Sequence, residues 1–270
     1  MRVIRLLLII TIVSLSLFFS TYLSRMNAGS YYILLGRQLS DQIEYLQKTT
    51  YTGDLSAQKD QAREYFETGI SLFPMYGWGQ YLYGKYLYYN ILLDEALEQY
   101  TLCLENFDNI DIHKDIGITY YYMQEYDKAL HYLNNHLKLV AGDATTLQMI
   151  GHSYFAKEEY EKAIEYYSRS VEIQEDANIY NFIGVAYSHL RDFENALAPF
   201  ERAVELDPNL APVYENLAAL YGYRLQEKQY EKAIESYQKF LILEPDTPDR
   251  RVIERRIRYL THMADTHRNG

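Results

Sequence analysis

The stretch YNFIGVAYSHLRDFENALAPFERAVELDP, residues 180–208, holds two apolar patterns separated by a short polar break. In its first half, apolar and small residues recur at positions i, i+3, i+4 and i+7, which places them on one face of a helix. The residues of that face are Tyr180, Ile183, Gly184 and Tyr187. The small residue among them predicts a close approach by a second helix.

The second half of the stretch predicts that second helix. Ala196, Phe200 and Ala203 form its apolar set. Pro208 ends it, because proline cannot continue a helix and disfavours helical backbone in the preceding residue. Each such hairpin leaves one apolar side uncovered, so the hairpins are expected to stack on one another.

The same unit recurs along the chain with a nearly constant period. Its small residue returns at intervals of 33, 34, 33 and 34, as Gly84, Gly117, Gly151, Gly184 and Ala218. The pattern of a large residue, Leu-Gly and Tyr, followed by Ala, Phe and Pro, resembles the tetratricopeptide repeat (TPR). The resemblance covers residues 77–246, with five units that start near 77, 110, 144, 177 and 211.

The resemblance implies an all-α fold, an α-solenoid in which TPR hairpins wind into a right-handed superhelix. A degenerate sixth unit or cap is expected within residues 26–76, after a juxtamembrane helix. Its second half matches the motif, whereas its first half, around residues 43–53, matches poorly. The matching residues are Ala62, Phe66, Gly69 and Pro74.

The fifth unit departs from the pattern. The distance from Tyr221 to Ala233 is three residues longer than the equivalent distance from Tyr187 to Ala196. The loop or the helix ends there are therefore expected to be about one turn longer. One interpretation is a tolerated insertion between helices, and the other is a lip that contacts a partner.

Residues 1–25 are predicted to form an N-terminal membrane anchor. The stretch over residues 6–24 carries no charge, and its apolar part, Leu6–Leu23, would span about 27 Å as a helix, just enough for the hydrocarbon core. The alternative is a signal peptide cleaved after Ala28, although Met26 is a poor residue for that site. The distribution of arginines leans towards a cytoplasmic N-terminus and an extracytoplasmic, periplasmic or external, repeat domain.

The overall charge argues against a nucleic-acid partner. Lys plus Arg number 26 against 37 Asp plus Glu, a net charge of −11, whereas phosphate contacts require basic patches. The single cysteine, Cys103, excludes an internal disulfide and is expected to be an inert, packed thiol.

The TPR resemblance also indicates a partner-binding groove. In TPR proteins the first helix of each unit lines the concave face through its second, fifth, ninth and twelfth positions. Aromatic anchors at such positions are typical of protein interfaces, although the rings could instead pack against the degenerate unit. The predicted groove residues are Trp78, Tyr81, Lys85, Tyr88, Lys114, Tyr121, His152, Phe155 and Asn181. The Lys-and-Asn clamp of chaperone-binding TPR domains is missing, because Ile118 occupies a position that needs Asn.

Residues 247–270 are predicted to form a capping helix and tail. Ile253, Ile257 and Leu260 share one helical face that would cover the last repeat. A basic C-terminal patch lies in the same segment. It is interpreted either as the solvated outer face of a capping helix or as a site that contacts an anionic lipid or an acidic partner. The patch consists of Arg250, Arg251, Arg255, Arg256 and Arg258.

No enzymatic chemistry is indicated. The glycines at 77 and 79 lack the spacing of a dinucleotide fingerprint, and Gly151 lacks the second glycine of a nucleophile elbow. The seven histidines show no metal-ligand spacing, so neither a metal nor a cofactor is expected.

The sequence therefore predicts a membrane-anchored TPR scaffold for protein–protein interaction, an accessory or assembly factor of a bacterial envelope complex. One alternative is a secreted or periplasmic peptide-binding module, with a chaperone-like role, released by signal cleavage. Another is a regulatory subunit of an enzyme complex. The partner is a protein or peptide, and self-association through a terminal repeat is a further option.

Overall fold

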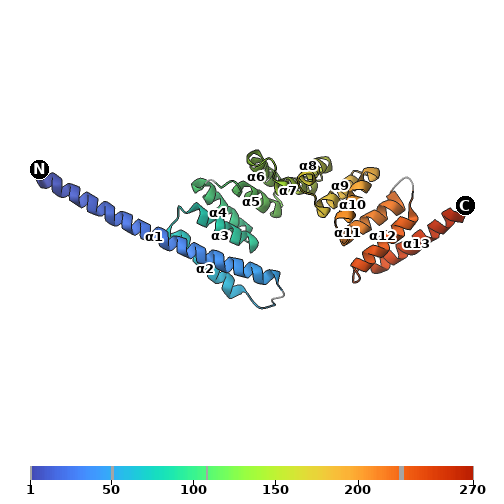
Figure 1. The fold of residues 1–270 in the computed structure, drawn as a ribbon, viewed down its shortest axis with the longest axis horizontal. Coiled ribbons are helices and arrows are strands. Elements are labelled where there is room, and N and C mark those ends of the chain that lie inside the picture. The colour runs from blue at the N-terminus through green and yellow to red at the C-terminus, as the bar shows by residue number, and fades with distance from the viewer. Residues whose placement is uncertain (1, 50–51, 108, 225–227, 270) are drawn as a thin grey trace. The chain divides into compact units, whose positions relative to one another are not determined.

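A computed structural model gives the fold of the chain (Figure 1). It describes residues 2–49, 52–107, 109–224 and 228–269, with the backbone alone for residues 2–16, 106 and 269. All regular structure in these residues is helical, as the all-α expectation requires. The chain divides into two compact units, Met1–Met123 and Gln124–Gly270, and each is described by itself.

Unit 1 consists of one long helix followed by shorter ones. In chain order its elements are α1 (Arg2–Lys48), α2 (Ser56–Leu72), α3 (Gly77–Tyr89), α4 (Leu93–Asn106) and α5 (Ile112–Tyr122). Helix α1 packs along α2, and α3 pairs with α4.

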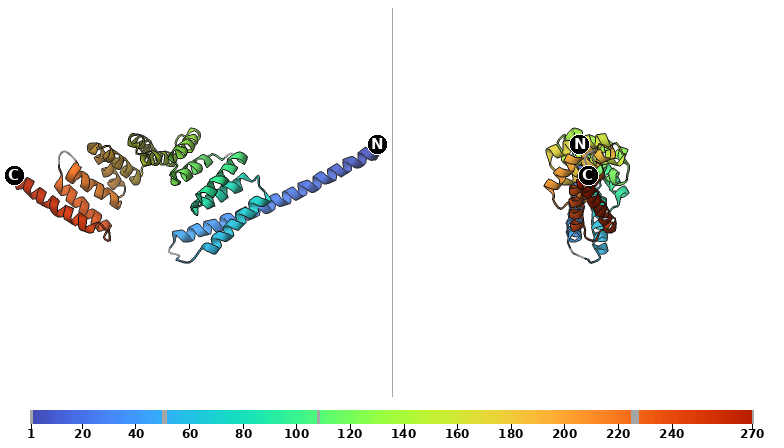
Figure 2. Two further views of the ribbon diagram at one scale, coloured as in Figure 1. Left: turned by 180° about the vertical axis from the view of Figure 1, so that it is seen from behind. Right: turned by 90° about the vertical axis from the view of Figure 1, so that its right-hand side faces the viewer.

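Unit 2 continues with helix pairs and a final helix. Its elements are α6 (Tyr126–Leu139), α7 (Ala144–Ala156), α8 (Tyr160–Ile173), α9 (Ala177–His189), α10 (Phe193–Leu206), α11 (Ala211–Ala219), the π-helical turn η1 (Leu220–Arg224), α12 (Tyr230–Leu243) and α13 (Arg250–Asn269). Figure 2 shows the pairs α7/α8, α9/α10 and α11/α12 following one another, with α13 beside α12.

The small residue of each repeat lets the two helices of a hairpin approach closely. A Cβ atom added to Gly84 would lie 2.7 Å from the Tyr100 ring. At Gly184 it would lie 2.6 Å from the Phe200 ring, and at Gly151 the distance to the ring of the second helix would be 2.5 Å. No real Cβ fits at such distances, so the sequence-based explanation of the small residue is confirmed.

Four turns between successive helices share one backbone feature. A non-glycine residue in each turn has a positive φ of 60° to 64°, the left-handed region that side chains disfavour. These residues recur with the repeat period: Ile91, Gln124, Glu158 and Arg191.

The most strained of these turns offers a route to a more stable protein. Ile91 is β-branched and 80% exposed, so it bears the cost of φ 64° without a packing benefit. Asparagine tolerates this backbone, and we expect Ile91→Asn to raise the free energy of unfolding by about 1 kcal/mol in urea titrations. Ile242→Asn is the matched control, because Ile242 is 72% exposed inside α12 and should give no gain.

The first half of the degenerate unit begins earlier in the chain than predicted. The part of α1 around Gly29 and Gly36 packs closely against α2, and Ile43, within the predicted stretch 43–53, is also buried. A Cβ on Gly36 would lie 3.0 Å from the Phe66 ring, and one on Gly29 would lie 2.9 Å from the Gly69 carbonyl oxygen. Gly36 thus allows close approach of an aromatic ring from the next helix, as Gly84 does. It lies 48 residues before Gly84, whereas the repeat period would place it about 34 residues before.

The longer fifth unit forms a π-helical turn. Helix α11 ends at Ala219 and continues directly into Leu220–Arg224, and the backbone N–H of Gln229 returns to the Tyr221 carbonyl oxygen at 2.9 Å. Residues 225–227 lie outside the described residues. Part of the extra length therefore extends the first helix of this repeat.

The predicted membrane anchor falls largely on residues whose side chains lie outside the described part of the chain. Within the described part, no helix has a stretch long and apolar enough to cross a membrane. Of the predicted span over residues 6–24, only residues 17–24 have described side chains, although the α1 backbone runs through all of it. The anchor therefore stays a prediction.

Candidate partner-binding surfaces

The predicted groove residues of unit 1 lie on two helices. Four of them belong to α3: Trp78, Tyr81, Lys85 and Tyr88. They are three or four residues apart, so they share one face of that helix. The Trp78 and Tyr81 rings lie 5.3 Å apart, and the Lys85 ammonium lies 5.6 Å from the centre of the Tyr81 ring. Trp78, Lys85 and Tyr88 are partly exposed and Tyr81 is buried; together these four side chains are called the aromatic surface.

A carboxyl group that the sequence interpretation missed lies beneath this surface. The Tyr81 hydroxyl donates to Asp115 Oδ2 at 2.8 Å, which ties α3 to α5. Burial raises the pKa of Asp115, while the Lys85 charge and the Tyr81 hydrogen bond oppose that rise. Burial and the neighbouring carboxylate also raise the pKa of Tyr81. Tyr81 is only 6% exposed, so it positions neighbouring groups and offers little area to a partner.

Two neighbouring pockets open on this surface of unit 1. The larger, about 320 Å³, lies between α1 and α3 and includes Trp78. The smaller, about 180 Å³, lies between α3 and α5 and includes Tyr88 and Asp115. Both pockets are lined by Lys85 and Tyr89. Tyr89 is 54% exposed, and the sequence interpretation missed it because it lies beyond the four helix positions carried over from the family.

The α5 residues of the predicted groove have near neighbours of their own. The Lys114 ammonium pairs with Asp111 Oδ1 at 2.9 Å. The Tyr121 ring meets Tyr122 edge-on, with 5.4 Å between centroids, and Tyr122 in turn contacts Tyr88 at 5.9 Å. Tyr121 is thus linked through Tyr122 to the aromatic surface on α3.

In unit 2, the predicted groove residues take part in packing. His152 Nδ1 lies 2.7 Å from the Tyr167 hydroxyl, and the His152 ring lies edge-on to Phe182 at 4.7 Å. Phe155 also contacts Phe182, at 5.8 Å. Asn181 Oδ1 accepts a hydrogen bond from Asn216 Nδ2 at 3.1 Å, which links α9 to α11.

The environment of His152 makes the stability of unit 2 depend on pH. Burial lowers the pKa of His152 from 6.5 to about 4, although the charge of Asp176 opposes this shift. As the pH falls below 6.5, the unfolded chain binds a proton here that the folded chain does not bind until about pH 4. The stability contributed by neutral His152 is therefore fully present above pH 6.5 and is lost progressively between pH 6.5 and 4.

We expect this histidine to account for a loss of about 2 kcal/mol in unfolding free energy between pH 7.5 and pH 5. Urea titrations of the wild type and His152→Gln at both pH values measure it, because glutamine can still accept the Tyr167 hydrogen bond but does not titrate. The wild type should lose about 2 kcal/mol more than the variant. An equal loss in both proteins would show that His152 is not the group responsible.

The basic C-terminal patch is only partly engaged. Helix α13 buries Ile253 and Leu260 against the core of the last hairpin. Arg250 donates to the Pro245 carbonyl oxygen, and Arg256 donates to the Tyr237 hydroxyl and pairs with Glu215 at 3.6 Å. The exposed remainder of the patch is Arg251, Arg255 and Arg258.

Two further kinds of site were considered among the described residues, a reactive thiol and a metal centre. Cys103 is buried, and burial raises the pKa of its thiol to about 11, so the reactive thiolate is disfavoured. Across the described part of the chain, no group of three His, Cys, Asp or Glu side chains could hold a metal ion.

Comparison with known proteins identifies the repeats. The tetratricopeptide repeat family matches residues 110–176 and, in an overlapping match, residues 142–209. Residues 110–209 carry tetratricopeptide repeats. Comparison with curated proteins gave no match.

Several solved structures resemble the fold of most of this chain. PilF of Pseudomonas aeruginosa is 15% identical, with a TM-score of 0.63 over 86% of this chain and 99% of that chain. YrrB, described as a TPR protein with an unusual peptide-binding site, is 23% identical, with a TM-score of 0.57 over 68% of this chain and 94% of that chain. The chain in the Cut9–Hcn1 structure is 18% identical, with a TM-score of 0.59 over 88% of this chain. The present chain covers only 45% of the length of the chain in the Cut9–Hcn1 structure.

Proposed function

We propose that this protein is a TPR scaffold that binds a protein or peptide partner through the aromatic surface of unit 1. The observation that carries the proposal is the pair of neighbouring pockets that share Tyr89 and Lys85. Trp and Tyr supply large contact areas at low entropic cost and dominate binding energies at protein interfaces. Tyr89 is half-exposed and lies between the two pockets, so a partner side chain in either pocket would contact its ring.

The chemistry of the pockets favours a segment that combines apolar and polar side chains. Aromatic rings form much of the wall, while Asp115 and Lys85 supply one acceptor and one donor in the smaller pocket. The larger pocket is at the lower end of the volume range of about 300–1,000 Å³ that small-molecule ligands occupy, so it suits one or two side chains. A partner helix or extended segment that places neighbouring side chains in both pockets fits this surface.

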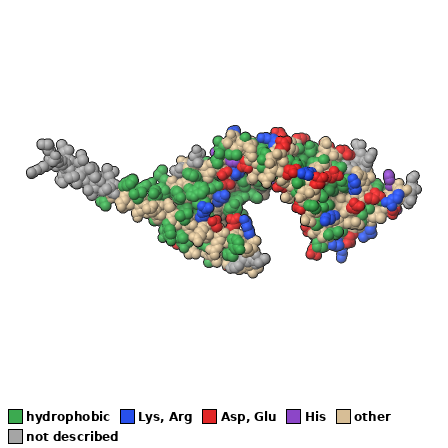
Figure 3. All heavy atoms as spheres, viewed as in Figure 1, with side chains coloured by type: hydrophobic (Ala, Val, Ile, Leu, Met, Phe, Trp, Pro, Cys, Tyr) green, Lys and Arg blue, Asp and Glu red, His purple; other side chains and the backbone are tan. Residues whose placement is uncertain are grey.

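We further propose that the scaffold is tethered to a membrane through residues 6–24, with a cytoplasmic N-terminus and the repeats on the extracytoplasmic side. In support, large apolar side chains remain exposed on α1 where that segment ends (Figure 3). They are Leu17, Phe18, Phe19, Tyr22 and Leu23. A contiguous apolar patch of this kind marks an interaction with a membrane or a protein. The setting that we propose is an assembly complex of the bacterial envelope.

Fractionation of cells that produce the full chain tests the tether. We expect a protein with an intact N-terminus in the membrane fraction, resistant to high salt and released by detergent. Protease added outside the cytoplasmic membrane should digest the repeats. A shortened, soluble product would instead indicate a secreted peptide-binding module and would contradict the tether.

The scaffold proposal is tested by crosslinking in native membranes, followed by purification of the full chain and mass spectrometry. We expect a partner in fixed stoichiometry with the chain. A catalytic protein as that partner would indicate a regulatory subunit. Recovery of only unrelated peptides, without a defined partner, would contradict the proposal.

A further inference from the structure

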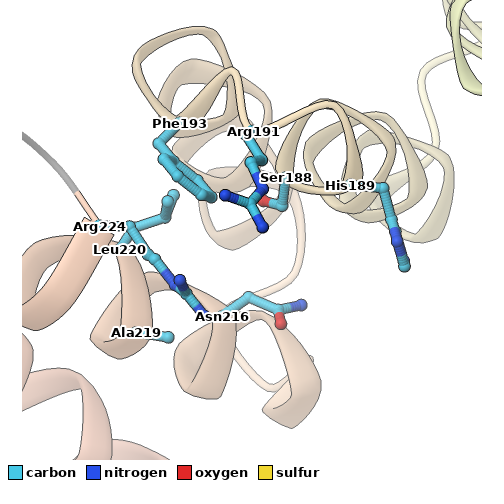
Figure 4. A pocket seen from close by; sticks show the side chains of 8 residues that line it. All are labelled: Ser188, His189, Arg191, Phe193, Asn216, Ala219, Leu220 and Arg224. Atoms are coloured by element: carbon cyan, nitrogen blue, oxygen red, sulfur yellow. The ribbon is translucent and has the colours of Figure 1, made fainter.

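A third pocket, with a different chemistry, lies within unit 2. It has a volume of about 350 Å³ and lies between the α9–α10 turn and the end of α11 (Figure 4). No carboxylate is among the residues that line it, although the chain as a whole carries a net charge of −11. The lining residues are Ser188, His189, Arg191, Phe193, Asn216, Ala219, Leu220 and Arg224.

Two arginines extend towards this pocket from different elements. Arg191 occupies the left-handed position of the α9–α10 turn, with φ 60°, and Arg224 is the last residue of the π-helical turn. Figure 4 shows both side chains reaching into the space between the two elements. The Arg224 guanidinium carbon lies 5.4 Å from the centre of the Phe193 ring, a cation–π contact that holds it in place.

Neither arginine has a carboxylate partner among the described residues, whereas some other arginines of unit 2 do. Arg202 pairs with Glu175 and Glu205, and Arg268 pairs with Glu231. Arginine offers a planar fork of donors that matches a carboxylate. Two such groups around one pocket, both without a carboxylate partner in the described part of the chain, form a site for an anion from outside the chain.

The longer fifth repeat contributes one of the two arginines of this site. Arg224 belongs to the π-helical turn that lengthens this repeat, and π-helical turns occur frequently at functional sites. Arg191 in a hairpin turn and Arg224 beyond α11 lie outside the helix positions that line a TPR groove, whereas Ser188 and Ala219 in the same pocket occupy two of those positions.

We propose that this pocket binds a carboxylate group of the partner protein, held between Arg191 and Arg224. Asn216 uses one N–H for Asn181 and keeps a second N–H for the ligand, whereas the Ser188 hydroxyl already donates to the Gly184 carbonyl oxygen. Phe193, Ala219 and Leu220 form an apolar wall beside the arginines that suits the stem of an acidic side chain. The proposal rests on the proposed function, because it assumes a protein partner.

Three synthetic peptides test the proposal with the full-length chain in a neutral detergent. The first is an eight-residue peptide with two glutamates and two leucines among glycines and serines, acetylated and amidated. The second replaces both glutamates by glutamine, and the third is that glutamine peptide with a free C-terminal carboxylate. Fluorescence anisotropy of rhodamine-labelled peptides gives the affinities. We expect one or both carboxylate peptides to bind, more weakly as salt is added, and the neutral peptide not to bind.

The variants locate the binding. Arg191→Gln combined with Arg224→Gln should weaken binding of the carboxylate peptide by about tenfold or more, since two charge-assisted hydrogen bonds are lost. Arg251→Gln combined with Arg255→Gln is the matched control, because it removes the same charge from exposed positions on α13. Equal melting temperatures would show that both double variants are folded.

The outcomes separate the alternatives. Binding of the glutamate peptide or of the free C-terminus identifies which carboxylate the pocket prefers. Equal affinity for charged and neutral peptides, no binding up to millimolar concentration, or a loss that follows the α13 pair would overturn the proposal. The Arg191 and Arg224 substitutions report on this pocket alone, so a failure here is distinct from a failure of the aromatic surface, which is measured with the natural partner.

Discussion

Replacing Gly151 by leucine is expected to lower the free energy of unfolding by about 3 kcal/mol or more. A Cβ at this position would lie 2.5 Å from two ring atoms of Tyr167, and leucine adds three further carbon atoms. The Tyr167 ring cannot move aside easily. It is fully buried, its hydroxyl is hydrogen-bonded to His152 Nδ1, and it stacks on Phe182 at 5.9 Å.

Thermal melting of the full chain measures this effect. A loss of this size lowers the melting temperature by about 6–12 °C for a domain of 150–250 residues. Since repeats contact mainly their neighbours, hydrogen exchange should also accelerate first over α7 and α8. Gly142→Leu is the matched control, because no atom lies within 4 Å of a Cβ there, and we expect its effect to stay within about 0.5 kcal/mol. Equal stability of the two variants would contradict the close hairpin packing.

Replacing Tyr89 by alanine is expected to weaken partner binding about 30-fold, the equivalent of about 2 kcal/mol. Tyr89 lines both pockets of unit 1, so its removal opens the wall between them. It is 54% exposed, so its loss should change folding little. Tyr81→Ala would be less informative, because Tyr81 is buried and its hydroxyl bonds to Asp115.

Affinity for the partner identified by crosslinking is the measurement, made with purified full-length variants. Tyr45→Ala is the matched control, because Tyr45 lies on α1 in the same unit, is 69% exposed and lines neither pocket. The control should bind as the wild type does. Equal affinities of the Tyr89 and Tyr45 variants would exclude the aromatic surface as the binding site.

The sequence predicted the repeat architecture because the requirement for a small residue is local and periodic. Gly84, Gly151 and Gly184 each contact an aromatic ring of the next helix. Because this contact recurs in each of these repeats, the glycine recurs at a fixed period that can be recognised in the sequence. Gly36 makes the same kind of contact but was missed. Additional residues in α1 and in the connection to α2 shift it out of phase with the later repeats.

The candidate site was harder to predict, because helix position alone does not show how a side chain is used. Tyr81 and His152 occupy positions that face a partner in the family, yet both are held by hydrogen bonds to neighbouring helices. Tyr89 lies beyond those positions, and Asp115 stands out in the sequence only as an acidic residue next to buried isoleucine. The position of the Arg224 side chain depends on a π-helical turn. The length of the insertion alone does not predict such a turn.

The central claim, that the partner lies on the aromatic surface of unit 1, is tested most directly by site-specific photocrosslinking in the full-length chain. A photoreactive phenylalanine analogue is placed at position 89 in one protein and at position 45 in another, and both are irradiated in native membranes. We expect the analogue at position 89 to form a covalent adduct with the partner, and the analogue at position 45 to form none. An adduct at position 45 with none at position 89 would contradict the claim.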